Sequence, residues 1–164
     1  MANPEELLTP DEVLRRYTSG PKTGVFSDGS CEGNPGPGGW GFVWVADDVI
    51  VEQASGTAPD TTNNRMELTA LIEAYKKLPT YAEVTIRSDS QLCVKTVNEW
   101  AAGWEKRGWR RKSGPIANLE LVQELYALAN AHPQVTLEWI RAHDGSRWNE
   151  YADALASAYM LSGS

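Results

Sequence analysis

The spacing of apolar residues follows two different periods along the chain, and this limits the folds that the chain can adopt. Residues alternate between two faces over 25–28, 40–45 and 49–55, with Asp47-Asp48 as a turn, which predicts three consecutive strands in an antiparallel ribbon. After Asn64 the apolar residues recur at helical spacing, at Leu68, Leu71, Ile72, Tyr75 and Leu78. A helix is therefore predicted that Asn64 caps and that ends near Pro79.

The rest of the chain alternates helices with short strands. A buried strand is predicted over 83–88, a helix just after Asp89, a helix over roughly 121–129, a strand over 135–140 and a last helix over 148–160. Helices that alternate with strands in this way cover the faces of a mixed sheet, so the fold class is α/β.

One domain accounts for this pattern, because a chain of 164 residues without repeats or a long linker can bury a sufficient core. Residues 21–164 are assigned to that domain, and residues 1–20 to a short N-terminal extension. Thr9 as cap, Pro10 at the first helical position and Glu12 as capping-box partner predict a helix of about two turns in the extension.

Cysteine usage and the N-terminal composition favour a reduced, cytoplasmic protein, with a monomer as the default. Cys31 and Cys93 are too few for a disulfide framework and lack the spacing of a zinc site. No apolar run approaches the roughly 18 residues of a membrane span. Residues 1–20 hold Glu5, Glu6, Asp11 and Glu12 where a signal peptide would be basic and then apolar.

A formal net charge of -7 argues against general binding to nucleic acids. One segment differs from this average, because 104–114 carries five cationic residues and Glu105 as its one acid: Lys106, Arg107, Arg110, Arg111 and Lys112. An anionic partner is expected at this segment.

Four acidic residues are candidates for one catalytic centre, and each also has a structural alternative. Asp28 ends the first strand before a glycine-rich stretch whose amides could approach a ligand, or it stabilises a turn. Glu67 could be a capping-box partner, and Asp89 could be a helix N-cap. Asp153 could lie on a solvated acidic helix face.

Taken together, these acids favour a metal centre. Asp28 and Asp89 follow predicted strands, and ligands of open α/β sheets bind beyond the carboxyl ends of strands. Carboxylates that converge repel one another unless cations lie between them. Hard oxygen ligands suit Mg²⁺ or Mn²⁺, and two such ions can stabilise the attacking and leaving oxygens of a phosphodiester displacement.

Four segments carry a family resemblance that covers about residues 22–160. In order and spacing, they resemble the signature blocks of type 1 ribonuclease H: SDGSCEGNPGPGGWG, TTNNRMELTAL, SDSQ and WIRAHDGSRWNEYADALA. The resemblance implies a ribonuclease H-like fold with a five-stranded mixed sheet flanked by helices. It also implies an endoribonuclease that cuts the RNA strand of RNA–DNA hybrids and leaves 5′-phosphate and 3′-hydroxyl ends.

The resemblance further implies the roles of the acids. Asp28 would bridge two Mg²⁺ ions, with Mn²⁺ as a possible substitute. Asp153 would bind the ion that activates water, and Glu67 and Asp89 the ion near the leaving oxygen. His143 matches the family's mobile histidine, which assists proton movement or product release and could otherwise be an ordinary loop histidine. Its loop lacks the histidine and proline of some relatives, which leaves the turnover rate open.

The same resemblance implies the contacts to the hybrid. Cys31, Asn34, Asn63 and Gln91 would follow the RNA strand, where the 2′-hydroxyl distinguishes RNA from DNA, and Thr62 and Asn64 would lie near the DNA strand. Their structural alternatives are a small buried filler for Cys31, and turns and caps for the asparagines.

The segment EWAAGWEKRGWRRK resembles the family's basic protrusion, a helical handle that grips the DNA strand with Trp104 and Trp109 beside the cations. Trp100 is expected in the core instead. Glu105 stands where relatives often have a lysine, which is expected to weaken binding. Two alternatives to this function are a catalytically silent hybrid-binding module and a DNA-cutting nuclease of the same fold.

Overall fold

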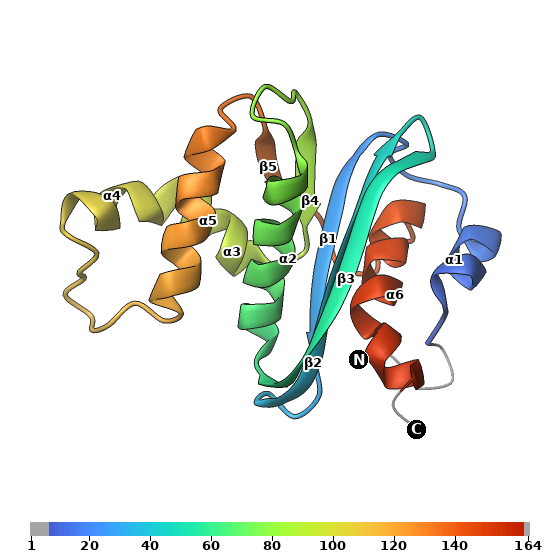
Figure 1. The fold of residues 1–164 in the computed structure, drawn as a ribbon, viewed down its shortest axis with the longest axis horizontal. Coiled ribbons are helices and arrows are strands. Elements are labelled where there is room, and N and C mark those ends of the chain that lie inside the picture. The colour runs from blue at the N-terminus through green and yellow to red at the C-terminus, as the bar shows by residue number, and fades with distance from the viewer. Residues whose placement is uncertain (1–6, 163–164) are drawn as a thin grey trace.

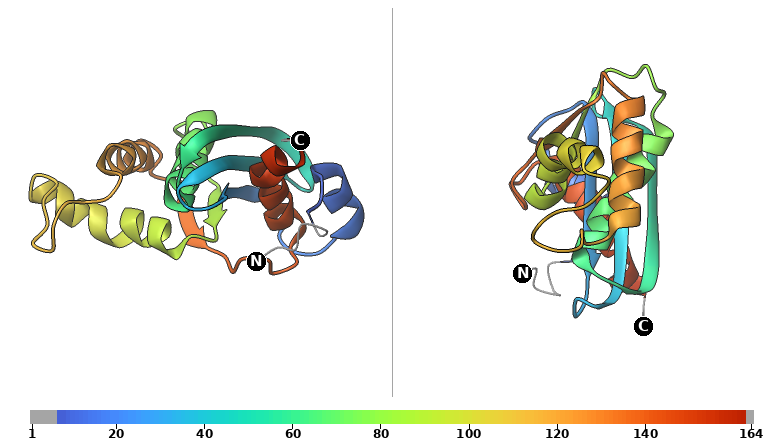
Figure 2. Two further views of the ribbon diagram at one scale, coloured as in Figure 1. Left: turned by 90° about the horizontal axis from the view of Figure 1, so that it is seen from below. Right: turned by 90° about the vertical axis from the view of Figure 1, so that its left-hand side faces the viewer.

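A computed structural model describes residues 7–162 of the chain, so residues 1–6 of the predicted extension lie outside the described part. A five-stranded mixed sheet with the strand order β3-β2-β1-β4-β5 forms the middle layer. Helices α2 and α5 lie on one side of the sheet, and α6 and α1 lie on the other (Figures 1 and 2). The predicted α/β class and five-stranded mixed sheet are confirmed.

The first three strands form the predicted antiparallel ribbon. They are β1 (Gly24–Cys31), β2 (Gly36–Ala46) and β3 (Val49–Thr61). Asp47 and Asp48 make the turn between the last two in left-handed conformations (φ 50 and 64°), which aspartate tolerates better than most residues. Strand β3 continues past the predicted end at residue 55 because it pairs with β2 as far as Gly36↔Thr61.

The glycine-rich stretch before Trp40 belongs largely to strand β2, which the sequence did not predict. A Cβ atom on Gly39 would lie 2.3 Å from the carbonyl oxygen of Ala156, and one on Gly41 would lie 2.5 Å from Cβ of Leu155. These glycines therefore let helix α6 (Arg147–Ser162) pack closely on β2. The prediction that the glycine-rich stretch leaves amides free for a ligand is wrong for Gly39, which pairs with both neighbouring strands, whereas Gly41 lies in its predicted strand.

Helix α2 (Asn63–Lys77) begins one residue after Thr62, which is its N-cap. The Thr62 hydroxyl oxygen accepts a hydrogen bond from the Arg65 N–H at 3.2 Å. The predicted cap, Asn64, is wrong because this residue already lies inside the first turn. The predicted end near Pro79 is confirmed, since Leu78 is the C-cap.

Two parallel strands complete the sheet, β4 (Thr85–Ser88) beside β1 and β5 (Thr136–Trp139) beside β4. Between them lie α3 (Gln91–Lys95), a π-helical segment η2 (Thr96–Trp100), α4 (Ala101–Lys106) and α5 (Leu119–Ala131). Figure 1 shows α4 and the loop after it projecting away from the sheet. The prediction of a core position for Trp100 is wrong, because its side chain is 38% exposed in η2 on this projection.

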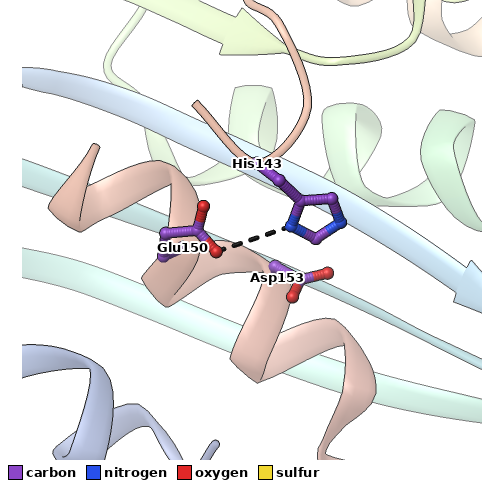
Figure 3. A group of neighbouring side chains, drawn as sticks. All are labelled: His143, Glu150 and Asp153. Carbon is purple, nitrogen blue, oxygen red and sulfur yellow. Dashed lines mark ion pairs between the residues drawn. The ribbon is translucent and has the colours of Figure 1, made fainter. Parts of the chain in front are cut away.

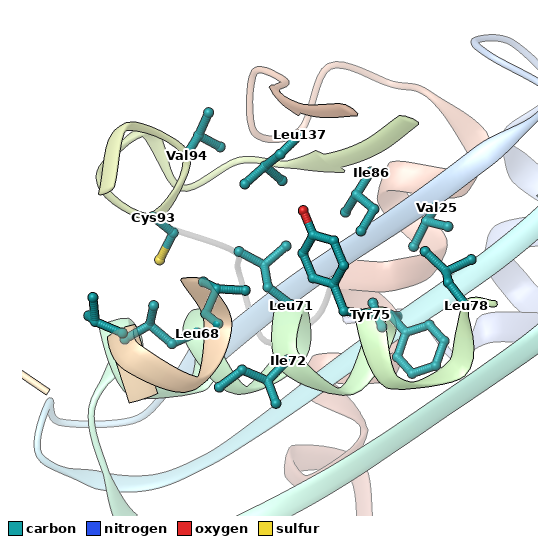
Figure 4. Packing of buried hydrophobic residues seen from close by; sticks show 14 residues of the cluster. Val25, Leu68, Leu71, Ile72, Tyr75, Leu78, Ile86, Cys93, Val94 and Leu137 are labelled. Carbon is teal, nitrogen blue, oxygen red and sulfur yellow. The ribbon is translucent and has the colours of Figure 1, made fainter. Parts of the chain in front are cut away.

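Alternate residues of β1 supply two separate cores. Val25 packs with Leu71, Tyr75 and Ile86 on the α2 side, as Figure 4 shows. Phe26 points to the other face and packs with Trp148 of α6 and Val13 of α1 (Pro10–Arg16). Helix α1 has the predicted capping box between Thr9 and Glu12, so this prediction is confirmed. Full burial of such side chains contributes about 1.5–3 kcal/mol each to the free energy of unfolding. It also fixes the strand register at the site.

Candidate active site

Asp28 lies on β1 where parallel pairing with β4 ends. The last parallel pair is Ser27↔Ser88, and Asp28 is the next residue, with its side chain 7% exposed. The prediction that Asp28 ends its strand is wrong, because β1 continues to Cys31 in antiparallel pairing with β2. Asp28 nevertheless stands at the carboxyl edge of the parallel part of the sheet, where ligands of α/β proteins bind.

Glu67 reaches the same point from the second turn of α2, and its side chain is 8% exposed. The backbone N–H of Gly29 donates to Oδ1 of Asp28 at 2.8 Å and also to Oε1 of Glu67. The alternative role of Glu67 as a capping-box partner is wrong, because the cap is Thr62 and the residue three positions later is Arg65. The Oε2 atom of Glu67 is buried and has no hydrogen-bond partner among the described residues.

Asp89 follows β4 directly. The N-cap of α3 is Ser90, whose hydroxyl accepts from the Cys93 N–H at 3.2 Å, so the alternative role of Asp89 as an N-cap is wrong. The indole N–H of Trp139 donates to the carbonyl oxygen of Asp89 at 3.2 Å and ties this residue to β5. One carboxylate oxygen each of Asp28, Glu67 and Asp89 lie within 4.8 Å of one another.

Burial and mutual repulsion make these three carboxyl groups weak acids. Burial raises the pKa of Asp28 well above its ordinary value, and the neighbouring carboxylates, Glu67 first, raise it further. Burial raises the pKa of Glu67 to about 8 and is also the largest cause of the raised pKa of Asp89. Because a cation between the carboxylates would reverse this effect, the arrangement favours binding of a metal ion.

The raised pKa of Glu67 predicts how the stability of the metal-free protein depends on pH. The folded chain binds a proton at Glu67 between its ordinary pKa of 4.5 and about 8, and the unfolded chain does not. The free energy of unfolding in EDTA should therefore fall from about pH 5 to about pH 8. Urea unfolding across this range measures the effect, and Glu67→Gln should make the dependence on pH less steep. A free energy that rises over this range would contradict the prediction.

Figure 3 shows a second group of polar side chains, His143, Glu150 and Asp153. Nδ1 of His143 lies 3.5 Å from Oε1 of Glu150, and a ligand atom of each of these residues and of Asp153 lies within 4.8 Å of the others. Asp153 and His143 also line a cavity of about 400 Å³ together with Asp28 and Asp89. The structure thus brings Asp28, Asp89, Asp153 and His143 to one cavity, and a Glu67 oxygen lies within 4.8 Å of oxygens of Asp28 and Asp89.

Glu150 is a site residue that sequence reasoning missed. A solvated acidic helix face was the structural alternative for its neighbour Asp153, but Glu150 itself is only 9% exposed. Its two oxygens face His143 and the N–H of Gly145, which donates to Oε2 at 3.4 Å. The spacing of three residues between Glu150 and Asp153, which puts both on one face of α6, was the available signal.

The residues predicted to contact the RNA and DNA strands lie around the start of α2 and the β1–β2 turn. Oδ1 of Asn34 accepts from the Asn63 N–H at 2.8 Å, and the Cys31 thiol points to the carbonyl oxygen of Thr61 at 3.3 Å. The Cys93 thiol lies 3.5 Å from Oδ1 of Asn64. Cys31 and Asn63 line the cavity that holds the acids, whereas Gln91 is exposed at the start of α3.

The basic segment is helical only as far as Lys106, so its prediction as a helical handle is correct for α4 and wrong for the residues after it. The guanidinium of Arg111 lies 5.9 Å from the ring centroid of Trp104 and donates to the carbonyls of Gly114 and Pro115. Trp109 packs on Tyr126 with 6.1 Å between ring centroids. The other cations of the segment are exposed, namely Lys106, Arg107, Arg110 and Lys112.

Comparison with known proteins places these features in a family. The sequence matches the model of the RNase H family over residues 21–160. The chain belongs to the ribonuclease H family. The match begins just after the N-terminal extension and includes the four acids, His143 and the basic segment.

Three similar proteins carry that name. "Ribonuclease H" of Methylorubrum extorquens is 49% identical over 136 residues, which cover 83% of this chain and 59% of that protein. "Ribonuclease H" of Cupriavidus necator is 48% identical over 134 residues, 81% of this chain and 91% of that one. The crystal structure of a type 1 RNase H with the type 2 active-site motif, LC9-RNase H1, is 36% identical, with a TM-score of 0.71 over 90% of this chain and 76% of that one.

Proposed function

We propose that this chain is an endoribonuclease that hydrolyses the RNA strand of RNA–DNA hybrids and leaves 5′-phosphate and 3′-hydroxyl ends. The observation that carries the proposal is that Asp28, Asp89 and Asp153 line one cavity in a chain of the ribonuclease H family, with a Glu67 oxygen within 4.8 Å of those of Asp28 and Asp89. A catalytically silent module has no need of so many buried carboxylates, because their repulsion destabilises the fold. The ribonuclease H fold at 36% identity supports the same assignment.

The donor set fits two Mg²⁺ ions, with Mn²⁺ as a substitute. Its oxygens are hard ligands, and the buried, unpartnered Oε2 of Glu67 would gain a partner in a bound cation. In the proposal Asp28 would help to hold both ions, Asp153 would help to hold one of them, and Glu67 and Asp89 the other. Bound ions supply an activated water and neutralise the charge that develops on the scissile phosphate.

The chain's own groups orient this centre and move protons. The Gly29 N–H contacts both Asp28 and Glu67, so it fixes two carboxylates relative to one another. His143 is exposed at the cavity and faces Glu150, so its ring can exchange a proton with both solvent and the reacting groups. Glu150 would orient the ring through Nδ1 and leave Nε2 for this transfer.

Hybrid binding is assigned to two surfaces. Cys31, Asn34, Asn63 and Gln91 would contact the RNA strand beside the acids, and Thr62 and Asn64 the DNA strand. Within the basic handle, residues 104–112 would bind DNA phosphates through their exposed cations, and Trp104 and Trp109 would contact sugars or bases. Residues 21–164 would form the catalytic domain and residues 1–20 an extension to it.

Neutralising the free cations of the handle should weaken substrate binding more than chemistry. In Arg107→Gln/Arg110→Gln/Lys112→Gln we expect KM to rise on the order of tenfold at physiological salt, with little change in kcat. KM should also depend less steeply on salt concentration than in the wild type. Arg111 is kept because it anchors the loop to Gly114 and Pro115. Arg15→Gln/Lys22→Gln/Lys77→Gln removes the same charge from exposed positions elsewhere and should leave KM near that of the wild type. An unchanged KM in the handle variant would reject the assignment.

The proposed function itself is tested with one labelled strand in four contexts: RNA–DNA hybrid, RNA duplex, DNA duplex and single-stranded RNA. Each is incubated with Mg²⁺, with Mn²⁺ and with EDTA. Cleavage that needs a metal and is confined to RNA in the hybrid is the expected result. Cleavage of DNA would favour a DNA-cutting nuclease of this fold, and binding of the hybrid without cleavage would favour a silent module.

We also propose that the protein works in the cytoplasm as a monomer. Among residues 7–162 no helix is long and apolar enough to cross a membrane. Both cysteines are free, which agrees with a reducing compartment. Light scattering at micromolar concentration tests the oligomeric state, and a mass of twice 18.1 kDa would contradict it.

A further inference from the structure

The N-terminal segment, defined here as residues 7–20, lies outside the family match yet beside the active site. Its helix α1 packs against α6 (Figure 1). Leu7, Leu8, Arg16 and Tyr17 line a pocket of about 450 Å³, which His143 and Asp153 also line. Leu7 also borders the cavity that holds Asp28 and Asp89, so the two hollows adjoin.

Arg147, the first residue of α6, joins this segment to the end of the loop that carries His143. Its Nε donates to the carbonyl oxygen of Tyr17 at 2.7 Å, and its Nη2 donates to that of Leu14 at 3.2 Å. Leu14 lies in the last turn of α1 and Tyr17 is its C-cap, where carbonyl groups lack helical partners and attract cations. One side chain therefore binds α1 to the start of α6.

Ser19 and Gly20 hold the same loop through the backbone. Ser19 and Ser146 form a parallel β-bridge, the Ser19 carbonyl accepts from the Arg147 N–H at 2.9 Å, and the Ser19 hydroxyl donates to the Gly145 carbonyl at 3.3 Å. Gly20 has a φ of +96°, and a Cβ atom there would lie 2.6 Å from Cβ of Ser146. The contact is thus too close for a larger residue.

From these anchors the loop runs back to the catalytic histidine. Asp144 accepts from both the N–H and the hydroxyl of Ser146 at 2.8 Å, and the Gly145 N–H donates to Glu150. Glu150 in turn faces His143 across 3.5 Å (Figure 3). His143 itself is exposed and has a φ of 52°, so its place depends on how the rest of the loop is held.

We propose that the N-terminal segment is a positioning element for catalysis, which holds the 143–146 loop through Arg147, Ser19 and Gly20 so that His143 faces the acidic cavity. Arg147 is accordingly a positioning residue. The inference rests on the proposed ribonuclease activity. It assigns a role to residues that precede the family match.

Kinetics of Arg147→Met test the inference, because methionine keeps an aliphatic side chain and removes the guanidinium. We expect kcat to fall roughly tenfold with KM changed less than about twofold, since the loop and not the substrate contacts is disturbed. Arg147→Lys should recover part of kcat, because its ammonium can donate to Tyr17. When His143 is already replaced with Ala, adding Arg147→Met should not lower kcat further. A loss of equal size in that background would overturn the inference, as would an unchanged kcat in Arg147→Met.

Hydrogen exchange of the loop amides provides a readout that needs no activity. Amides of residues 143–147 should exchange faster in Arg147→Met than in the wild type. Equal exchange rates would overturn the inference that Arg147 helps to hold this loop. Arg15→Met is the matched control, because Arg15 is exposed in the last turn of α1, and it should change neither exchange nor kcat. If the wild type does not cut hybrids, the proposed function fails, whereas the exchange result still decides whether the segment holds the loop.

Discussion

Replacing Asp28 with Asn should abolish metal-dependent cleavage of the hybrid while leaving the protein folded. The change removes a charge from the acid cluster at nearly constant volume, so kcat should fall by roughly three orders of magnitude or more. Because the buried Asp28 carboxylate is repelled by Glu67 and Asp89, the variant should be at least as stable as the wild type in EDTA near pH 8. Single-turnover cleavage and urea unfolding measure the two effects.

A matched control separates this effect from a general response to loss of an acid. Asp60 lies on the exposed part of β3. The variant Asp60→Asn should leave both cleavage and its metal dependence unchanged. If Asp28→Asn keeps Mg²⁺-dependent cleavage, Asp28 has no part in metal binding. If the Asp28→Asn variant loses both its activity and its cooperative unfolding transition, the loss of activity is due to unfolding of the protein.

Replacing Gly29 with Ala should damage stability and activity together. A Cβ atom at this position would lie 2.4 Å from the backbone nitrogen of Glu67 and 2.5 Å from the carbonyl carbon of Met66. These are backbone atoms of α2, so the helix must shift away from β1. We expect the free energy of unfolding to fall by about 1–3 kcal/mol, as for overpacked cores, and kcat to fall strongly because the shift moves Glu67 away from Asp28.

Cleavage by Gly29→Ala should be measured at a temperature where its unfolding curve shows a fully folded population. Gly103→Ala is a suitable control, since its nearest neighbour is the flexible end of Arg107 at 3.4 Å and it lies in a helix. Alanine there should be neutral or stabilising by up to about 1 kcal/mol. Full activity of folded Gly29→Ala would show that the contact between β1 and α2 does not set the distance between the carboxylates.

The order of helices and strands was predictable because it depends on local patterns. Alternation in β1 and helical spacing in α2 reflect which face of each element is buried, and that period is visible in a short window. The capping box of α1 is likewise local. The exact N-cap of α2 was less predictable, since Thr62 and Asn64 are both suitable cap residues and the structure has Thr62 in that position.

Departures from the predictions lie where distant segments meet. Gly39 was attributed to a ligand-binding turn, but the nearest atoms to it belong to α6, more than a hundred residues later. Trp100 has the spacing of a core residue, but the π-helical turn changes the register of the helix and leaves the ring on the projection. Glu150 looks solvated in sequence because nothing near it shows that the His143 loop covers it.

The sequence by itself determined the fold class and the family and named four candidate acids, because these follow from local periodicity and from ordered motifs. Only the tertiary structure decided that Glu150 faces His143, that Gly29 joins two carboxylates, and that Ser19 pairs with Ser146. The physical reason is that burial, desolvation and close approach depend on side chains brought together from remote positions. Those contacts set the geometry of the site, and no short stretch of sequence contains both partners.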